Sequence, residues 1–287
     1  MNEENLLAMI LTHGRPDAVH ICNSLIRQGW TGPICILIDD EDKAADQYRE
    51  RFGDMVQIFN KKEWVEKTDS GDNNLENRKA IVYARNASYE IARKLGFRYF
   101  IQLDDDYTSF SYRENNNGDF TTGGKPRNMQ KTCGHLLDFF KRSKARAVSI
   151  AQTGDFIGGD KGSMFRDGLG IKRKCMNFWF CDTESPMSFS GRLNEDCSRY
   201  CEYGFRGELY FQIRAIALNQ VTTQKAKGGM SEAYSESGTY IKSFHTVMRC
   251  PSFVKVSVLQ TKNKRLHHKI NWENACPKII RESVRKL

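Results

Sequence analysis

Residues 98–106 read Arg-Tyr-Phe-Ile-Gln-Leu-Asp-Asp-Asp, an apolar run that ends in three consecutive carboxylates. A short apolar run bounded by polar residues is typical of a buried β-strand. In open α/β sheets, ligands bind outside the carboxyl ends of the strands. Because Asp104 and Asp106 are two residues apart, both can point to the same side of an extended segment. The stretch therefore predicts a strand with an oxygen-rich site at its end.

Two carboxylates on one side of a strand end suit a hard divalent cation. Mg²⁺ or Mn²⁺ prefers oxygen ligands and can bridge the phosphates of a bound nucleotide. The alternative is a solvated turn or a helix cap without chemistry. The three carboxylates alone do not distinguish a metal site from a solvated turn or cap, so the neighbouring sequence must be considered.

Toward the N-terminus, predicted strands and helices alternate. Apolar runs predict strands, and helical spacing or polar segments predict the helices between them: strands at 6–11, 34–38 and 56–59, helices at 17–29, 41–52 and 78–95. Strand, helix and strand at this spacing form a βαβ unit. We therefore expect an α/β fold, with a mostly parallel sheet flanked by helices.

Toward the C-terminus the pattern is less regular. The expected elements are a loop at 113–128, a helix at 129–143, a strand at 147–151, a glycine-rich loop at 154–170, strand-like or helical segments at 173–180 and 209–218, a mobile loop at 222–243 and a basic, weakly amphipathic tail at 262–287. No internal repeat or linker divides the chain. One domain over residues 1–287 is the simplest expectation.

Composition limits the function classes. The 287 residues carry a formal net charge of +9, and no apolar run approaches the roughly 18 residues that span a bilayer. The polar, acidic start does not look like a secretory signal. Nine scattered cysteines suit a reducing cytosol better than a disulfide framework. Basic clusters at 141–146, 172–174 and 262–269 favour a polyanionic partner, with a solvated basic surface as the alternative.

The helix before the acidic strand supplies the missing context. The segment from Ala84-Arg85-Asn86, through Gly96 and the aromatic-rich strand, to Asp104-Asp105-Asp106 resembles the family-2-like GT-A glycosyltransferases. The resemblance implies a Rossmann-like GT-A fold that binds a nucleotide-sugar, with a UDP-sugar expected. It also implies these positions: Thr12, His13 and Arg15 near the nucleotide, Asp39 near the base, Arg85 near the diphosphate, Asp104 and Asp106 on Mn²⁺ or Mg²⁺, and Asp105 facing the ribose or supporting the turn.

Two downstream features complete the expected site. Asn194-Glu195-Asp196 looks like the family's Glu-Asp motif at the start of a helix, which implies that Asp196 is the catalytic base and that Glu195 positions a neighbour or the acceptor. A capping pair without chemistry is the alternative. By the same resemblance, His245 is a third metal ligand whose loop closes over the nucleotide, although a lone histidine is often structural. We expect His267 and His268 on the surface.

The whole chain is similar, more loosely, to phage-type glycosyltransferases that modify hydroxymethylated pyrimidines in DNA. The similarity rests on Thr-His-Gly-Arg-Pro at 12–16, the acidic triplet, the Asn-Glu-Asp motif and the basic charge taken together. It implies inverting transfer to 5-hydroxymethylcytosine in double-stranded DNA by a cytoplasmic monomer. Residues 1–110 would bind the nucleotide-sugar, residues 111–261 would bind the acceptor and catalyse, and residues 262–287 would form the basic tail.

Several alternatives stay open. The aromatic residues 178–180 either stack on a flipped base or pack in the core. The acceptor could be a saccharide or a protein instead of DNA. Nucleotidyl transfer and non-catalytic nucleic-acid binding also fit parts of the pattern, whereas no P-loop spacing is present.

Overall fold

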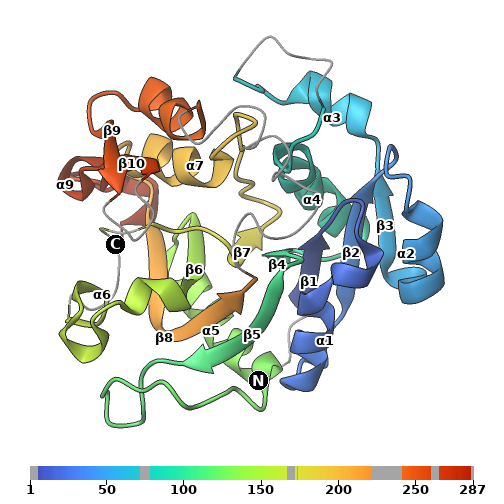
Figure 1. Ribbon diagram of the computed structural model, residues 1–287, viewed down its shortest axis with the longest axis horizontal. Helices are drawn as coiled ribbons and strands as arrows, with labels where there is room; N and C mark the ends of the chain where they lie inside the picture. Colours follow the sequence, from blue (N-terminus) through green and yellow to red (C-terminus); the bar gives the residue numbers. More distant parts are fainter. Residues whose placement is uncertain are drawn as a thin grey trace.

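The computed structural model describes residues 6–71, 78–166, 172, 174–221, 241–259 and 265–285. Eight strands form one mixed sheet in the order β3-β2-β1-β4-β7-β6-β8-β5 (Figure 1). The strands are β1 (Leu6–Leu11), β2 (Ile34–Asp39), β3 (Val56–Phe59), β4 (Tyr99–Asp104), β5 (Tyr107–Tyr112), β6 (Ala147–Gln152), β7 (Trp179–Asp182) and β8 (Tyr210–Gln220). The helices that bear on the site are α1 (His20–Arg27), α2 (Ala45–Phe52), α3 (Lys61–Lys67), α4 (Val82–Lys94), α5 (Met129–Ser143) and α7 (Glu195–Gly204).

The sheet is covered on both faces because its strands are apolar throughout. Along β1, the residues Leu6, Ala8 and Ile10 join one core cluster, and their alternating neighbours join the other. The first cluster includes buried side chains of α1, α2 and α5, and the second includes those of α3, α4 and α7. Period-two alternation with apolar residues on both sides is what a strand buried in the middle of a three-layer fold requires.

The two halves of the sheet differ in strand direction. Strands β3, β2, β1 and β4 are all parallel. Beyond β4, the strand β7 runs antiparallel to both β4 and β6, whereas β6 and β8 are parallel and β5 is antiparallel to β8. The predicted α/β fold with a mixed, mostly parallel sheet is therefore confirmed. The expected division at residue 110 falls inside β5, so the sheet itself is continuous across it.

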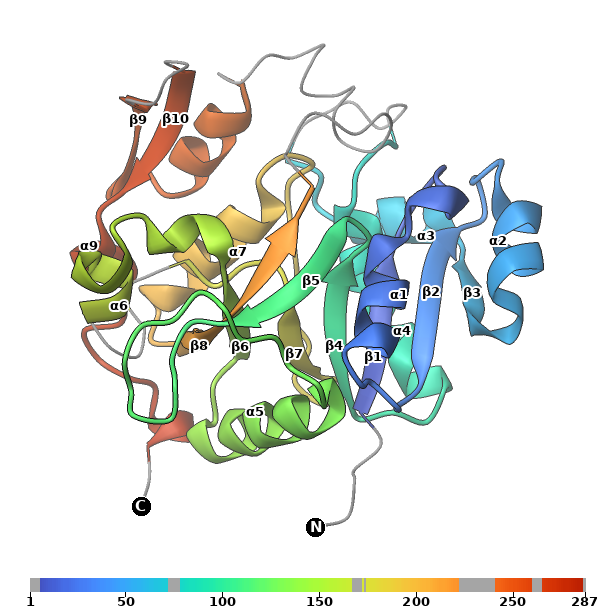
Figure 2. The same cartoon turned by 60° about the horizontal axis from the view of Figure 1, so that its bottom comes forward.

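The C-terminal part differs from the expected basic tail. β9 (Val254–Leu259) and β10 (Arg265–Ile270) pair as an antiparallel hairpin, and the short helix α9 (Trp272–Ala275) follows. Leu266, His268 and Ile270 alternate with basic residues, which is a strand pattern. The basic residues between them give the segment the composition of a charged tail. Figure 2 shows this hairpin at one end of the molecule and α5 at the other.

Other expectations are settled by burial. Phe178, Trp179 and Phe180 are almost fully buried, so the base-stacking interpretation of this trio is wrong and core packing is correct. Short 3₁₀ and α-helical turns occupy residues 153–166 of the predicted glycine-rich loop. Most of the predicted loop at 222–243 lies outside the described residues, and 241–249 are helical. No helix in the described ranges has the length and apolar character needed to cross a bilayer.

Candidate active site

The carboxyl ends of β1, β2 and β4 meet at one edge of the sheet. The register pairs Leu11 of β1 with Asp104 of β4, and pairs the same Leu11 with Leu37 of β2. Thr12, Asp39 and the acidic triplet therefore leave the sheet side by side. This placement follows from parallel pairing alone, since parallel strands end at the same edge.

Asp105 binds protein partners and is only 1% exposed. Its carboxylate accepts two hydrogen bonds from Arg15, from Nε and from Nη2, each 2.7 Å long. The hydroxyl of Thr12 donates a third, at 2.6 Å. These contacts favour the predicted role in supporting the turn over contact with the ribose. They also show how Thr12 and Arg15 are held at the strand edge.

Asp39 is the centre of a second buried network. His13 Nδ1 lies 2.7 Å from Asp39 Oδ2, and Lys61 Nζ lies 3.2 Å from Oδ1. Hydrogen bonding to Asp39 raises the pKa of His13 above its usual value. Burial alone would raise the pKa of Asp39, but His13 and Lys61 outweigh it and lower that pKa. Asp39, the last residue of β2, is therefore an ionised carboxylate in a fixed position. The His13 side chain beside it is partly exposed.

Arg85 connects the strand edge to the second acidic motif. Its side chain on α4 is 3% exposed and lies over the ring of Trp179, with Cζ 4.7 Å from the ring centroid. Nε donates to Glu195 Oε1 at 2.8 Å, and Nη2 lies 3.2 Å from Asp104 Oδ1. The expectation that Arg85 lies near a diphosphate needs refinement, because its contacts are with the protein's own carboxylates. It acts as a buried cation between Asp104 and Glu195.

Asp104 and Asp106 fit a divalent cation on two counts. Asp104 Oδ1 is buried without a hydrogen-bond donor, despite its proximity to Arg85. Burial, together with the Asp104 and Asp105 carboxylates, raises the pKa of Asp106 to about 7. Both observations indicate more negative character at this edge than the protein itself neutralises. Mg²⁺ and Mn²⁺ ions bind such oxygen pairs and complete their shell with water and phosphate oxygens.

His245 does not join this pair as predicted. It lies in the helical segment 241–249. Within the part of the chain that the structure describes, no three His, Cys, Asp or Glu side chains converge in a way that could hold a metal ion. The structure therefore does not bring His245 together with Asp104 and Asp106, and its role as a ligand stays a prediction.

Glu195 and Asp196 begin α7, as the sequence predicted. Glu195 is buried against Arg85, whereas Asp196 is only partly buried. Burial and the neighbouring Asp196 raise the pKa of Glu195, and Arg85 opposes that rise. The two carboxylates thus have different environments, since one is committed to the ion pair and the other is left partly open. That difference matches the assigned roles of a positioning group and a base.

Asn194 ties this motif to the C-terminal hairpin. Its Nδ2 donates to the Lys242 carbonyl at 3.0 Å and to Thr246 Oγ1 at 3.1 Å, and lies 3.1 Å from His268 Nδ1. His268 Nε2 lies 3.2 Å from Cys197 Sγ. The expectation that His268 is a surface residue is therefore wrong. His268 contacts α7, and the ring of the neighbouring His267 lies beside that of His268, with centroids 4.2 Å apart.

Three side chains of the site, from two tyrosines and one glutamine, were not predicted from the sequence. Tyr48 on α2 bonds Thr12 Oγ1 through its hydroxyl, at 2.9 Å, and accepts from the Arg15 amide. Tyr107 donates to Asp104 Oδ2 at 3.3 Å. Gln102 accepts from Arg85 Nη1 at 3.1 Å. Only Gln102 carried a signal, because a polar residue inside an apolar strand needs a buried partner.

The order of strands and the carboxylates at their ends agree with the class that the sequence predicted, a glycosyltransferase of the GT-A type. The model of one family, the TET-Associated Glycosyltransferases, matches residues 7–229, and the chain belongs to this family. No curated protein matches the chain. Among solved structures, two complexes of glucosyl-3-phosphoglycerate synthase from Mycobacterium tuberculosis are similar, both described as containing Mn²⁺ and UDP. The first is 7% identical to this chain and the second 8%, each with a TM-score of 0.48. Both matches cover 93% of this chain, and they cover 87% of the first synthase chain and 88% of the second.

Proposed function

We propose that this glycosyltransferase moves a sugar, with inversion, from a UDP-sugar to the hydroxymethyl group of 5-hydroxymethylcytosine in double-stranded DNA, in the cytoplasm. The observation that carries the proposal is the buried ion-pair chain from Asp104 through Arg85 to Glu195. It places the expected metal-binding strand end and the expected base motif within the reach of one side chain. A transferase needs this proximity, because the bond that forms and the bond that breaks share one anomeric carbon.

The reaction divides between the two motifs. The acceptor oxygen attacks the anomeric carbon while the bond from that carbon to the diphosphate oxygen breaks. Asp196 takes the proton from the attacking hydroxyl, and the nucleoside diphosphate leaves with the bonding pair. Asp104 and Asp106 would hold a divalent cation, which would supply positive charge to stabilise the leaving diphosphate. Arg85 holds Asp104 and Glu195 in place through its ion pairs. The negative charge of these two carboxylates outweighs burial and raises the pKa of Arg85.

The donor would bind at the first strand ends. Thr12, His13 and Arg15 lie beside Asp39 and Asp105, each held by at least one short hydrogen bond. Partly exposed His13 presents a polar ring edge at the position where the resemblance expects the nucleotide. Preorganised groups of this kind orient a ligand at little further cost in side-chain entropy.

The DNA acceptor has independent support. The family's description names an association with TET, which fits an acceptor in modified DNA. The formal net charge of +9 favours association with a polyanion. A hydroxymethyl group on a base also supplies the primary hydroxyl that the mechanism requires.

Asp196→Asn tests the proposal most directly. The amide keeps the shape of the carboxylate but cannot take the proton, so transfer to hydroxymethylated duplex DNA should fall by about 10²–10⁴-fold. UDP binding in Mn²⁺ should stay close to that of the unsubstituted protein. Mass analysis of digested nucleosides measures the transfer, and calorimetry measures the binding. Glu202→Gln on the same helix is the matched control, because Glu202 pairs with Arg249 away from Arg85.

The outcomes separate the alternatives. Wild-type-like transfer by the Asp196 variant would overturn the base assignment. Sugar transfer to a saccharide or protein, with none to DNA, would replace the acceptor. Release of pyrophosphate from a nucleoside triphosphate would show a nucleotidyltransferase. DNA binding without turnover, unchanged when Asp104, Asp106 and Asp196 are all replaced, would show a binding module.

A further inference from the structure

The β9–β10 hairpin has one apolar face and one basic face. The strand register pairs Val254 with Ile270, Val256 with His268, and Val258 with Leu266. Because side chains alternate along a strand, these residues share the face that includes His268. The opposite face carries Lys255, Ser257 and Lys269, with no acidic residue among them. On the apolar face Val254 is buried, whereas Val258 and Leu266 are exposed, so that face packs at only one end of the hairpin.

Lys255 and Lys269 form a cross-strand pair of like charges. They are paired directly in the register, and both are exposed. Neither has an ion pair within the residues that the structure describes. Like charges directly opposite one another destabilise a two-stranded ladder. An anion bound between them would remove that repulsion, so the pair favours an anionic ligand.

The basic face borders a groove of about 640 Å³. Lys172, Lys255 and Lys269 line it, together with the aromatic side chains of Phe253 and Trp272. Lys172 is paired with Glu273 at 2.6 Å, which leaves the two hairpin lysines as the uncompensated charge. Cations beside aromatic rings in an open groove are typical of surfaces that bind a nucleic-acid backbone.

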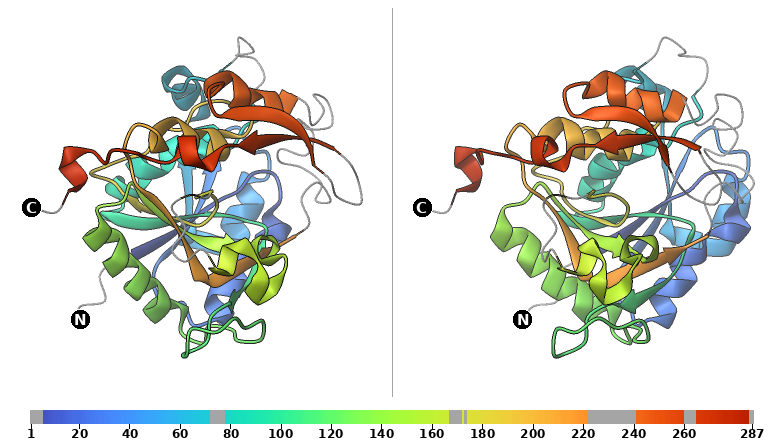
Figure 3. Two further views of the ribbon diagram at one scale, coloured as in Figure 1. Left: turned by 90° about the vertical axis from the view of Figure 1, so that its left-hand side faces the viewer. Right: turned by 60° about the vertical axis from the view of Figure 1, so that its left-hand side comes forward.

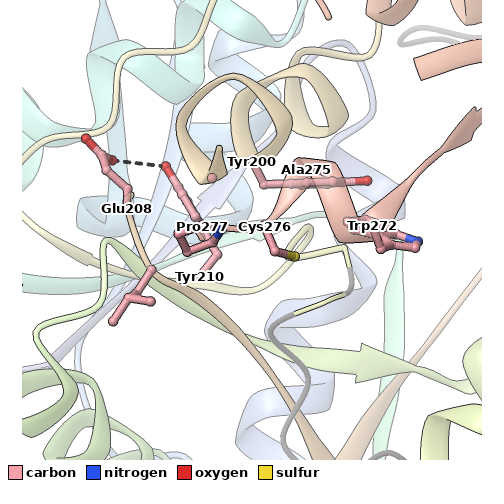
Figure 4. A pocket seen from close by; sticks show the side chains of 9 residues that line it. Tyr200, Glu208, Tyr210, Trp272, Ala275, Cys276 and Pro277 are labelled. Atoms are coloured by element: carbon pink, nitrogen blue, oxygen red, sulfur yellow. Dashed lines mark hydrogen bonds between the residues drawn. The ribbon is translucent and has the colours of Figure 1, made fainter. Parts of the chain in front are cut away.

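The hairpin is firmly attached at its base. The rings of Trp272 and Tyr200 are stacked, with centroids 5.6 Å apart and an interplanar angle of 23°. Figure 4 shows Trp272 and Cys276 beside Tyr200 and Tyr210, around a cavity of only about 10 Å³. That volume holds roughly one water molecule. The basic face is therefore presented by a well-packed element.

The position of the hairpin relates this face to the chemistry. His268 of β10 lies 3.1 Å from Asn194, the residue directly before Glu195 and Asp196. Lys269 follows His268 in β10, and strand alternation places it on the face opposite the one that contacts α7. The family model ends at residue 229, and the hairpin lies beyond it. This surface is thus a feature of the present chain outside the matched family region.

We propose that the basic face of the β9–β10 hairpin binds the phosphodiester backbone of duplex DNA. The proposal rests on the proposed function, because that function supplies DNA as the partner. A two-stranded antiparallel ribbon is narrow enough to follow a groove of B-form DNA. Lysine contacts to phosphates are sequence-independent, so this surface positions the substrate and does not read its sequence.

The test replaces both lysines with glutamine, as K255Q/K269Q in the full chain. Binding to a labelled 20-base-pair duplex is measured by fluorescence anisotropy over a NaCl series. Affinity at low salt should fall at least about tenfold, and the slope of log affinity against log salt should flatten by about 1.8, since each lost phosphate contact contributes about 0.9. The control K131Q/R142Q removes two exposed cations from α5, at the other end of the molecule (Figure 3).

A thermal melt separates binding from folding. Removal of the cross-strand repulsion should leave Tm unchanged or slightly higher in K255Q/K269Q. Equal loss of affinity in the α5 control, or an unchanged salt slope in the hairpin variant, would overturn the proposal. Tighter binding of an acidic polypeptide than of the duplex, lost in the hairpin variant, would assign the surface to a protein partner and would also overturn it.

Failure of this surface and failure of the proposed function give different results. Hairpin-dependent duplex binding without sugar transfer would reject the function and keep the surface. Transfer to hydroxymethylated DNA, with KM for DNA equal in the hairpin variant and the unsubstituted protein, would reject the surface and keep the function.

Discussion

The strand-end site and the outer face of the C-terminal hairpin handle charge in opposite ways. At the strand ends, buried Arg85 and Lys61 and partly exposed Arg15 each pair with carboxylates inside the protein. On the hairpin, Lys255 and Lys269 face each other and solvent. Internal pairing fixes side chains for chemistry, whereas uncompensated surface charge attracts a large, mobile ion. The comparison separates groups that build the site from groups that meet the substrate.

The largest effect should come from breaking the buried connection. Arg85→Met removes the cation and leaves Asp104 and Glu195 without it, which should lower the free energy of unfolding by about 3–5 kcal/mol. Urea denaturation measures the change. Arg142→Met on the surface of α5 is the control and should change stability by no more than about 0.5 kcal/mol. If Arg85→Met lowers the free energy of unfolding by less than about 1 kcal/mol, the buried ion pairs are not needed for stability and do not differ in this respect from surface charges.

The next effect concerns the excess negative charge at the strand end. Loss of an outer-shell partner typically weakens metal binding by about 10–100-fold. Asp106→Ala removes an expected ligand itself, so UDP binding in the presence of Mn²⁺ should weaken by at least about that factor. Binding without Mn²⁺ should change little. Calorimetry with and without the ion measures both. Equal binding in Mn²⁺ before and after the substitution would remove Asp106 from the metal site.

A smaller effect is expected at the turn. Asp105→Ala leaves Arg15 and Thr12 without their shared acceptor and should cost about 1–3 kcal/mol of stability. Donor affinity should fall too, because Thr12 and Arg15 lose their fixed positions. A matched Asp46→Ala substitution on the exposed face of α2 provides the baseline. Full donor affinity in Asp105→Ala would show that the turn holds its shape without this carboxylate.

The smallest effect is the pH dependence of the His13–Asp39 pair. The pKa of His13 is raised above 6.5, and the pKa of Asp39 is lowered below 3.8. The stability from protonated His13 is therefore complete below pH 6.5 and is lost as pH rises through the raised pKa. The difference in unfolding free energy between the unsubstituted protein and His13→Gln should be larger at pH 5.5 than at pH 8.5. A constant difference over that range would show that the pair is not ionic.

Local patterns in the sequence predicted most of the parallel half. The strands at 6–11, 34–39 and 99–104 each combine a continuous apolar run with a polar end. The apolar run predicts the strand, and the polar end predicts the site that follows it. Helices α4 and α5 were predicted to within a few residues for the same reason. Their buried positions recur at helical spacing and face the two core clusters.

The remaining features depend on long-range pairing. β5 and β8 lie next to each other although residues 107–112 and 210–220 are far apart in the chain, and β7 reverses the sheet's direction. No local period encodes such neighbours. The site shows the same limit: the sequence nominated Arg85, Asp104 and Glu195 separately, but only the fold shows that one guanidinium joins the other two.

The nine cysteines have a practical consequence. All nine are buried, and none of them forms a disulfide. Thiol reagents modify exposed thiolates, so the native chain should be close to silent toward a maleimide dye under reducing conditions. A single cysteine introduced at Ser257, on the lysine-bearing side of β9, would then be the sole accessible attachment point. A fluorophore or cross-linker attached there would report on molecules that approach that side, and none of the native cysteines would need to be replaced first.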